Sequence, residues 1–257
     1  MILCLDVGNT HIFGGVFEGD RLQLTFRHAT RAGVSSDELG LFFRGVLREN
    51  GVDPGRVRNI ALCSVVPDVV YSVSSACRKY FDCTPFILQA GVKTGLKILY
   101  RNPLEVGADR IANAIGAIHA RPDEDLLVLD LGTATTLDAL SADRDYLGGV
   151  IIPGLHMSME SLYRGTAKLG SVEIVRPPEC LGRSTSASIQ SGLYFGHRGA
   201  LREIIDQVSG EAFDGRVPHV IATGSFCGLF DDAGLYDEVI PELVLRGLLA
   251  ALLMNLG

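Results

Sequence analysis

The sequence of 257 residues lacks several of the marks by which large classes of protein are recognised. Its six cysteines form no C-x-x-C pair, which argues against a zinc site and favours buried thiols in a reducing compartment. The formal net charge is −7 and no basic stripe is present, so a general nucleic-acid binder is not expected. The phosphate-binding pattern GxxxxGKS is also missing, so any bound nucleotide must be held in another way.

Long hydrophobic runs and targeting signals are scarce as well. The N-terminus carries no basic stretch followed by a small-residue cleavage site, so we expect no signal peptide. The most apolar segment, residues 243–256, is too short to cross a bilayer and includes Arg246. We therefore expect a cytoplasmic protein with no membrane partner, in which this segment forms a core or interface helix.

The overall composition is that of an ordinary compact globular protein. Apolar residues make up 47% of the chain and charged residues 21%, as is usual for folded domains. A chain of this length lies where one core tends to divide into two. The composition therefore predicts a folded protein, and two lobes are plausible.

A supersecondary pattern occurs twice along the chain. Residues 2–6, 12–17 and 21–27 read as a meander of three strands, and residues 126–152 repeat the pattern. Aligning Asp6 with Asp130 gives an offset of 124 (130 − 6), which also carries Gly8 onto Gly132. Helices are predicted near 36–50, 67–81, 107–121, 154–168, 186–208, 226–232 and 241–255, with further strands near 59–66, 86–88 and 218–223. The helix at 107–121 is the expected boundary between the halves.

Each meander contains a strand that ends in aspartate and runs into a glycine-rich turn. The turns are DVGNT (6–10) and DLGTATT (130–136). Glycine lets the backbone approach a ligand, turn amides and hydroxyls can bind phosphate oxygens, and a carboxylate at the strand end can hold a cation. One such turn is more often a simple hairpin. Two copies at matching positions favour a nucleotide site.

These turns belong to a larger set of motifs. DVGNT, DLGTATT and VIATGS (220–225) resemble, in order, the two phosphate loops and the adenosine loop of the actin and sugar-kinase superfamily. GVKTGL (91–96), NPLEVGADRIANA (102–114), GGVIIPGL (148–155), TAKL (166–169) and IQSGLYFG (189–196) are similar to type III pantothenate kinases. The resemblance covers nearly the whole chain, and the motifs are specific in combination.

The resemblance implies the fold and its division. It implies an α/β fold of two ribonuclease-H-like domains, a duplicated βββαβαβα unit with an interdomain cleft. We place the N-terminal domain, with the first phosphate loop, at residues 1–114. The C-terminal domain, with the second phosphate loop and the adenosine loop, is placed at residues 115–257. The superfamily also implies that two phosphate loops clamp the nucleotide between the lobes.

The resemblance further implies ATP-dependent phosphorylation of pantothenate to 4'-phosphopantothenate, the first step of coenzyme A biosynthesis. The aspartate of GADR, here Asp109, becomes the general base. The substrate-binding residues carried over are Tyr100, Gly107, Ala108, Asp109, Arg110 and Thr185. The nucleotide-binding residues carried over are Asp6, Val7, Gly8, Asn9, Thr10, His11, Ile12, Phe13 and Thr133. The resemblance also implies a homodimer.

The residues around Asp109 agree with this role without establishing it. The segment after Pro103 is patterned as a helix, so Asp109 is expected in its first turn, where the helix dipole favours the anionic form. An ionised carboxylate can accept a hydroxyl proton and orient the alcohol. From the residues alone, a helix-capping role for Asp109 is about as plausible. Arg110 could pair with a carboxylate or phosphate, or form a surface ion pair.

Electrostatics predicts the cofactors. Neither phosphate loop contains lysine, and carboxylates beside a triphosphate would repel it. Magnesium bound with ATP would offset this repulsion. The resemblance adds a monovalent cation, potassium or ammonium, beside Asp130, which is the predicted metal ligand. Asp130 as a simple turn residue is the alternative.

Two other functions remain open from the sequence. The first is another small-molecule kinase of the superfamily, such as a sugar or acyl kinase. The second is a catalytically silent, nucleotide-binding regulator. Retention of Asp6, Asp109, Asp130 and Thr133 together argues against a silent protein, because a regulator needs no general base.

Overall fold

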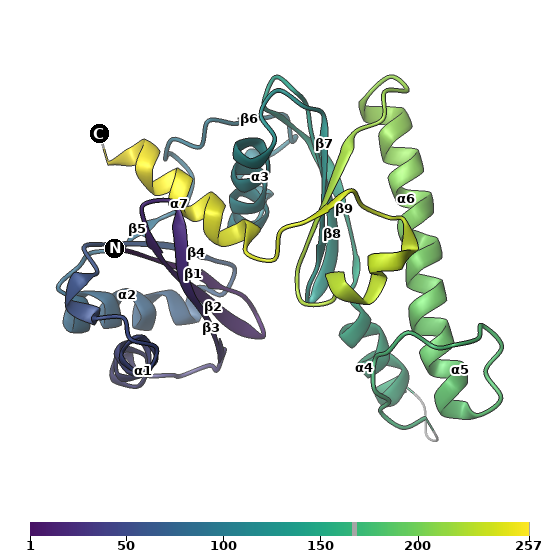
Figure 1. Cartoon of the computed structure of the whole chain (residues 1–257), viewed down its shortest axis with the longest axis horizontal. Helices are drawn as coiled ribbons and strands as arrows, with labels where there is room; N and C mark the ends of the chain where they lie inside the picture. Colours follow the sequence, from purple (N-terminus) through teal and green to yellow (C-terminus); the bar gives the residue numbers. More distant parts are fainter. Residues whose placement is uncertain (166–168, 257) are drawn as a thin grey trace. The chain divides into compact units, whose positions relative to one another are not determined.

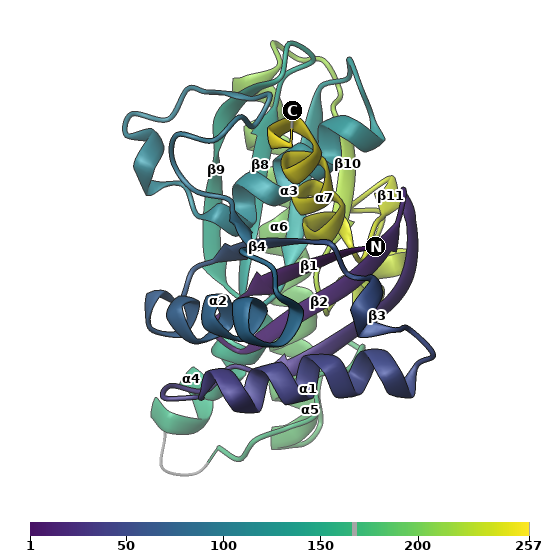
Figure 2. The ribbon, with the colours of Figure 1, turned by 90° about the vertical axis from the view of Figure 1, so that its left-hand side faces the viewer.

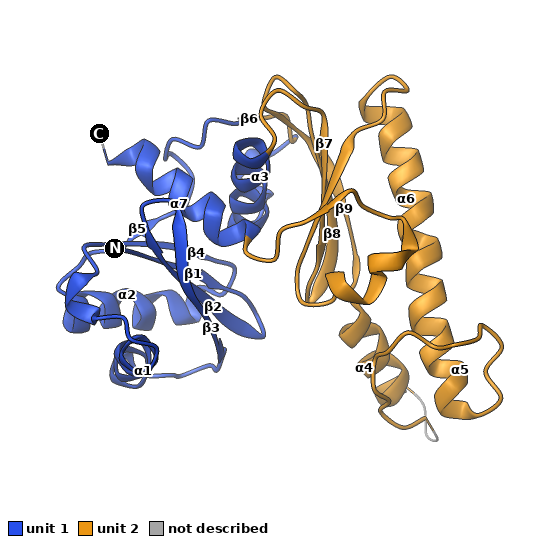
Figure 3. Ribbon diagram, viewed as in Figure 1, with its two compact units in different colours: residues 1–96, 101–120, 243–257 blue, residues 97–100, 121–242 orange. Residues whose placement is uncertain are grey.

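The computed structural model describes residues 1–165 and 169–256. The motif TAKL and the end of the helix predicted at 154–168 therefore lie partly outside the described residues. The chain forms two compact units (Figure 3). Unit 1 comprises residues 1–96, 101–120 and 243–257, and unit 2 comprises residues 97–100 and 121–242. The helix expected at the boundary thus lies in unit 1, together with the C-terminal segment.

Unit 1 is built on a sheet in the order β3-β2-β1-β4-β5. Its strands are β1 (Ile2–Val7), β2 (His11–Glu18), β3 (Arg21–Ala29), β4 (Asn59–Ser64) and β5 (Phe86–Ile87). The first three strands form the predicted antiparallel meander, and β4 and β5 continue the sheet in parallel.

Helices cover both faces of this sheet (Figures 1 and 2). One face carries α1 (Ser36–Glu49) and α2 (Pro67–Phe81), and the other carries α3 (Ala108–Ala120) and α7 (Leu243–Asn255). Leu3, Leu5 and Val7 of β1 belong to the core cluster with α1 and α2. Because successive strand residues point to opposite faces, Cys4 and Asp6 point toward the face of α3 and α7.

The apolar C-terminal segment forms a core helix, as the sequence predicts. Helix α7 crosses α3 closely, with Gly247 at the crossing. A Cβ atom added at Gly247 would lie 1.7 Å from the carbonyl oxygen of Ala112 in α3. Only glycine permits this approach.

Unit 2 repeats the sheet of unit 1. Its order is β11-β10-β7-β8-β9-β6, so β9-β8-β7-β10-β11 matches β3-β2-β1-β4-β5 strand for strand. These strands are β6 (Lys97–Ile98), β7 (Leu126–Leu131), β8 (Ala134–Leu140), β9 (Asp145–Pro153), β10 (His219–Thr223) and β11 (Glu238–Val239). The duplication predicted from the two aspartate turns is confirmed.

The register shows how closely the two halves correspond. Asp6 lies opposite Phe13 in the first hairpin, whereas Asp130 lies opposite Thr136 in the second. The separations are seven and six residues (13 − 6 and 136 − 130), so the second turn is one residue shorter. Both meanders then shift register at matching points, between residues 16 and 17 and between residues 139 and 140.

The helices of unit 2 differ more from expectation. They are α4 (Leu155–Gly165), α5 (Thr185–Ser191), a π-helix (Gly192–Gly196), α6 (His197–Ala212) and the 3₁₀ helix η4 (Cys227–Ala233). Helix α6 lies along one face of the sheet (Figure 1). The single helix predicted at 186–208 is therefore interrupted by a π-helical turn. Such turns are rare in proteins, and those that occur are often found at functional sites. No helix of the described residues is long and apolar enough to span a bilayer.

Candidate active site

The predicted site residues are divided between the two units. Unit 1 contains the first phosphate loop and the GADR segment, with Gly107, Ala108, Asp109 and Arg110. Unit 2 contains Tyr100, Asp130, Thr133 and Thr185.

The first phosphate loop is a tight turn between β1 and β2. The amide of Gly8 donates to the carbonyl of His11 at 3.0 Å. The hydroxyl of Thr30, after β3, donates to the Gly8 carbonyl at 2.7 Å. Asn9, Thr10 and His11 are exposed at the tip. These two hydrogen bonds therefore hold the turn in place, and its tip presents polar groups to solvent.

The other loop residues are placed differently. The side chains of Val7 and Ile12 are fully buried in the core cluster beside α1 and α2, so only their backbone groups could contact a nucleotide. Phe13 is also buried, and its ring lies 4.1 Å from the guanidinium carbon of Arg27. Asp6 is partly buried, and one of its carboxylate oxygens lies 3.3 Å from the thiol of Cys63.

Asp109 lies in the first turn of α3, as predicted. One carboxylate oxygen accepts the backbone N–H of Arg110 at 2.8 Å. Burial raises the pKa of Asp109, although this N–H and the charge of Arg110 act to lower it. Desolvation thus outweighs the helix-end stabilisation expected from the sequence. The raised pKa makes Asp109 a stronger base than an ordinary aspartate.

Asp6 and Asp109 belong to one electrostatic neighbourhood within unit 1. The negative charges of both act on the buried Cys63 and help to raise the pKa of its thiol, after burial itself. The segment after β4 connects them, because the Val65 amide donates to the Val7 carbonyl at 3.1 Å and the Val65 side chain lies beside Gly107. Unit 1 therefore brings the phosphate-loop carboxylate and the predicted base to one region.

Arg110 is 7% exposed, so its guanidinium is buried, whereas the surface ion pair that the sequence allowed as an alternative requires an exposed side chain. A buried guanidinium is an uncommon feature and requires polar partners. Its planar array of N–H groups suits a carboxylate or a phosphate.

In unit 2, the second phosphate loop and the adenosine loop lie side by side. Asp130 on β7 is in register with Thr223 on β10. The amide of Phe226 donates to the Leu131 carbonyl at 3.0 Å. Gly224 follows β10 with φ +92°, and an added Cβ atom there would lie 2.5 Å from an Asp130 carboxylate oxygen. The structure thus joins the two motifs predicted to hold opposite ends of a nucleotide.

The remaining predicted residues of unit 2 occupy other elements. Thr133 is exposed at the tip of the second loop, with Gly154 packed against its carbonyl. Tyr100 is partly buried, and its ring centre lies 6.4 Å from that of Tyr146. Thr185 is exposed and begins α5, which is capped by the hydroxyl of Ser184.

Two functional candidates were missed by the sequence reasoning. Cys63 lies in the strand predicted near 59–66, but its contact with Asp6 depends on the register of two strands distant in sequence. His197 follows the π-helix, is 8% exposed, and its Nε2 atom lies 3.0 Å from the hydroxyl of Thr135 in the DLGTATT segment. Burial lowers the pKa of His197, so its ring is neutral at pH 7.

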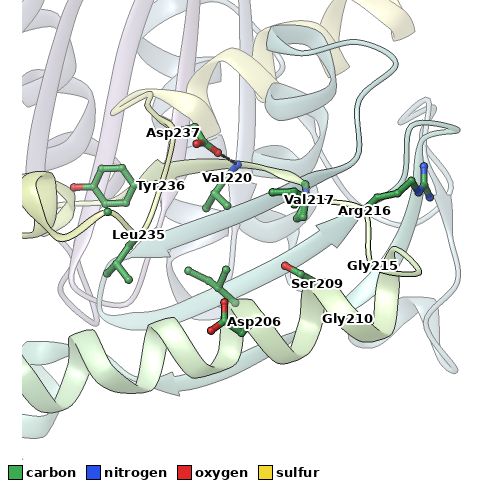
Figure 4. A pocket seen from close by; sticks show the side chains of 13 residues that line it. Asp206, Ser209, Gly210, Gly215, Arg216, Val217, Val220, Leu235, Tyr236 and Asp237 are labelled. Carbon is green, nitrogen blue, oxygen red and sulfur yellow. Dashed lines mark hydrogen bonds between the residues drawn. The ribbon is translucent and has the colours of Figure 1, made fainter.

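A cavity of about 520 Å³ also occurs in unit 2 (Figure 4). It lies between α6, the beginning of β10 and residues 234–237, where the Asp237 carboxylate accepts the Val220 N–H at 2.8 Å. Val220 belongs to the core beneath α6, whereas Asp130 and Thr223 have the opposite strand parity and face away from it. This cavity is therefore distinct from the predicted nucleotide loops.

The first phosphate loop fits the predicted magnesium ion in kind. Among residues 1–165 and 169–256, no group of three or more His, Cys, Asp or Glu side chains could hold a metal ion. Magnesium usually keeps several waters and is bound by one or two carboxylates together with substrate phosphates. The partly buried Asp6 at the first phosphate loop matches that magnesium pattern better than it matches a closed protein site.

Comparisons with known proteins agree with the motifs. The family model for type III pantothenate kinase matches residues 2–207. A type III pantothenate kinase of Legionella pneumophila (strain Corby) is 56% identical over 255 residues, covering 99% of each chain.

Solved structures share the fold at low identity. A Campylobacter jejuni protein described as a Baf family transcriptional activator has a TM-score of 0.63 at 17% identity, covering 98% of each chain. A ROK hexokinase from Thermus thermophilus has a TM-score of 0.53 at 17% identity, covering 99% of each chain. The predicted fold of two ribonuclease-H-like domains is thereby confirmed. The family match and the full-length identity together place this chain in the type III pantothenate kinase family.

Proposed function

We propose that this chain transfers the γ-phosphoryl group of ATP to the terminal hydroxyl of pantothenate, giving 4'-phosphopantothenate, with Asp109 as the general base. Membership of the family makes the chain a pantothenate kinase, an ATP-using enzyme of coenzyme A biosynthesis. The observation that supports the assigned base is the position of Asp109 in the first turn of α3, where burial raises its pKa and the Asp6 loop lies nearby.

Asp109 has two tasks in this proposal. It accepts a hydrogen bond from the pantothenate hydroxyl and so orients the oxygen toward the γ-phosphorus. It then takes the proton as the new P–O bond forms. In a loose phosphoryl-transfer transition state the proton leaves late, so orientation is the larger contribution.

The surrounding residues bind and position the two substrates. Gly107, Ala108 and Arg110 contact pantothenate, and the Arg110 guanidinium suits its carboxylate. Tyr100 and Thr185 are proposed as further pantothenate contacts. Residues 6–13 and Thr133 contact the phosphates of ATP through backbone amides and side-chain oxygens.

Magnesium and a monovalent cation complete the proposed site. Asp6 would hold magnesium through its water shell, and Asp130 would hold potassium or ammonium. Bound cations supply charge neutralisation for the triphosphate. The absence of lysine from both phosphate loops supports this assignment.

The decisive experiment is a coupled assay with ATP and magnesium, run with and without potassium. It compares pantothenate with a hexose, acetate and glycerol at equal concentrations. We expect turnover of pantothenate only, increased by potassium. Turnover of a sugar without turnover of pantothenate would favour another kinase of the superfamily. Nucleotide binding without any turnover would favour a silent regulator.

We also propose a homodimer in the cytoplasm. Ile151 on β9 and Met157 and Tyr163 on α4 are large apolar side chains exposed in unit 2, which a second copy of the chain would cover. The six free cysteines, four of them buried, suit a reducing compartment. Sedimentation should give a dimer that Ile151→Glu weakens, and a fully active wild-type monomer would contradict the proposal.

A further inference from the structure

Cys63 is a buried thiol to which none of the roles above gives a function. It lies in β4 with 0% of its surface exposed. Asp6 is its register partner on β1, and the sulfur lies 3.3 Å from Oδ1 of Asp6. Both side chains point to the α3 and α7 face of the sheet. The thiol thus contacts the carboxylate at the beginning of the first phosphate loop.

The direction of this hydrogen bond follows from the chemistry of the two groups. A carboxylate oxygen of Asp6 accepts, and the S–H group of Cys63 donates. This contact restrains one oxygen of the Asp6 carboxylate.

The second repeat also has a hydrogen-bonding residue in register with its loop aspartate, although that residue donates to a backbone carbonyl. Thr223 on β10 is the register partner of Asp130, as Cys63 is of Asp6, and it is 3% exposed. Its hydroxyl has a hydrogen-bond acceptor in the Pro241 carbonyl at 3.5 Å. The preceding residues, Leu62 and Ala222, are buried and apolar. In each half, therefore, an otherwise apolar buried strand carries one small hydrogen-bonding side chain beside the loop aspartate.

We propose that Cys63 is a positioning residue that holds the Asp6 carboxylate in the orientation used at the phosphate end of ATP. The inference rests on the proposed function, because it takes Asp6 as a nucleotide-site residue. Cys63 has no contact of its own with the substrates in this proposal. Its S–H donor acts through Asp6.

The competing explanation is that Cys63 only fills space, since free cysteine is among the residues most often buried. Three substitutions separate the two explanations. Cys63→Ser keeps a donor but is smaller, Cys63→Val fills the site with a slightly larger apolar side chain and has no donor, and Cys63→Ala is smaller and has no donor. A space-filling role predicts that valine is tolerated best, whereas a positioning role predicts that serine is.

The experiment measures kcat/KM for ATP, the dissociation constant for ATP with magnesium by calorimetry, and the melting temperature. We expect Cys63→Ser to stay within about twofold of wild type in both nucleotide measurements. Cys63→Val and Cys63→Ala should weaken both by roughly five- to tenfold, which corresponds to loss of an ordinary hydrogen bond and suits the weak thiol donor. The KM for pantothenate should change less than that for ATP.

Cys77 provides the matched control. It is also 0% exposed in unit 1, but it lies in α2 within the core on the other side of the sheet. Cys77→Ser and Cys77→Val should change the melting temperature without changing ATP affinity. A similar loss of ATP affinity in the Cys77 variants would show a general effect of core substitution and overturn the proposal.

The ATP-binding measurements distinguish failure of the Cys63 proposal from failure of the proposed function. If wild type binds ATP but does not phosphorylate pantothenate, the proposed function fails, and the calorimetric comparison still decides the role of Cys63. If Cys63→Val does not fold, serine against alanine supplies the same comparison. Wild-type ATP affinity in a variant without a donor, or equal losses in serine and alanine, would overturn the positioning role.

Discussion

Gly224 offers the most direct test of the packing around the second phosphate loop. It joins β10 to η4 with φ +92°, and an added Cβ atom would lie 2.5 Å from Oδ1 of Asp130 and 2.6 Å from the carbonyl carbon of Leu131. The second contact is with backbone, so it cannot be relieved by rotating a side chain. Gly224→Ala must therefore strain the turn and displace the phosphate loop, Asp130 included.

Gly234 separates these two costs. It also has positive φ, at +62°, but an added Cβ atom there would have no heavy atom within 4 Å. Gly234→Ala should cost only the left-handed conformation, about 1–2 kcal/mol. For a chain of this size each kcal/mol lowers the melting temperature by roughly 2–4 °C. We therefore expect a fall of roughly 2–8 °C with nucleotide affinity unchanged.

Gly224→Ala should add an overpacking cost of about 1–3 kcal/mol to the same strain. The melting temperature should then fall by roughly 4–20 °C, using the same conversion of kcal/mol into degrees. ATP affinity should fall by at least about tenfold, since displacement of the Asp130 loop need lose only ~1.4 kcal/mol of binding energy. Calorimetric titration with ATP, magnesium and potassium measures the affinity, and a thermal melt measures the stability. Equal melting temperatures and equal affinities for the two alanine variants would refute the assigned contact.

Three further predictions concern Asp109 and Thr135. Asp109→Asn should preserve ATP affinity and lower turnover by about 100-fold or more, and turnover near wild type would remove the residue from its role. Because burial raises the folded-state pKa of Asp109, the native protein holds more protons than the unfolded chain as pH rises from the ordinary value of 3.8 toward the raised one. Ionisation of Asp109 therefore lowers the free energy of unfolding as pH rises. We expect Asp109→Asn to have a higher melting temperature than wild type at neutral pH. This difference in melting temperature should shrink in acid, and one that does not would contradict the prediction. Thr135→Val should lose the hydrogen bond to His197 and about 1–3 kcal/mol of stability, whereas Thr135→Ser should keep most of it, as paired melts would show.

Much of the fold could be predicted because its signals are local. A strand that ends in aspartate, followed by a glycine turn and a second strand, can be recognised within about a dozen residues, and so the duplication was visible from Asp6 and Asp130. The position of α7 in unit 1 was not visible in this way. It depends on the close approach of Gly247 to Ala112, which lies far away in sequence.

The missed elements have similar physical reasons. The strands β6 and β11 contain two residues each, too few to show an alternating pattern. The π-helix at 192–196 widens the helix locally without removing its apolar face, so periodicity indicated one continuous helix. The raised pKa of Asp109 depends on burial, which only the packed structure defines.

The two halves are alike in the strands and turns proposed to bind the nucleotide, but they differ at the residue proposed to act on the acceptor hydroxyl. Both halves place an aspartate at the end of a central strand, as suits a phosphate chain that carries negative charge along its length. Helices α3 and α7 occupy corresponding places at the ends of the two repeats, but only α3 has an acidic residue in its first turn, namely Asp109. An in-line displacement has one attacking oxygen and needs one base. The duplicated strands thus suit nucleotide binding, and the proposal gives activation of the hydroxyl to the single carboxylate on α3.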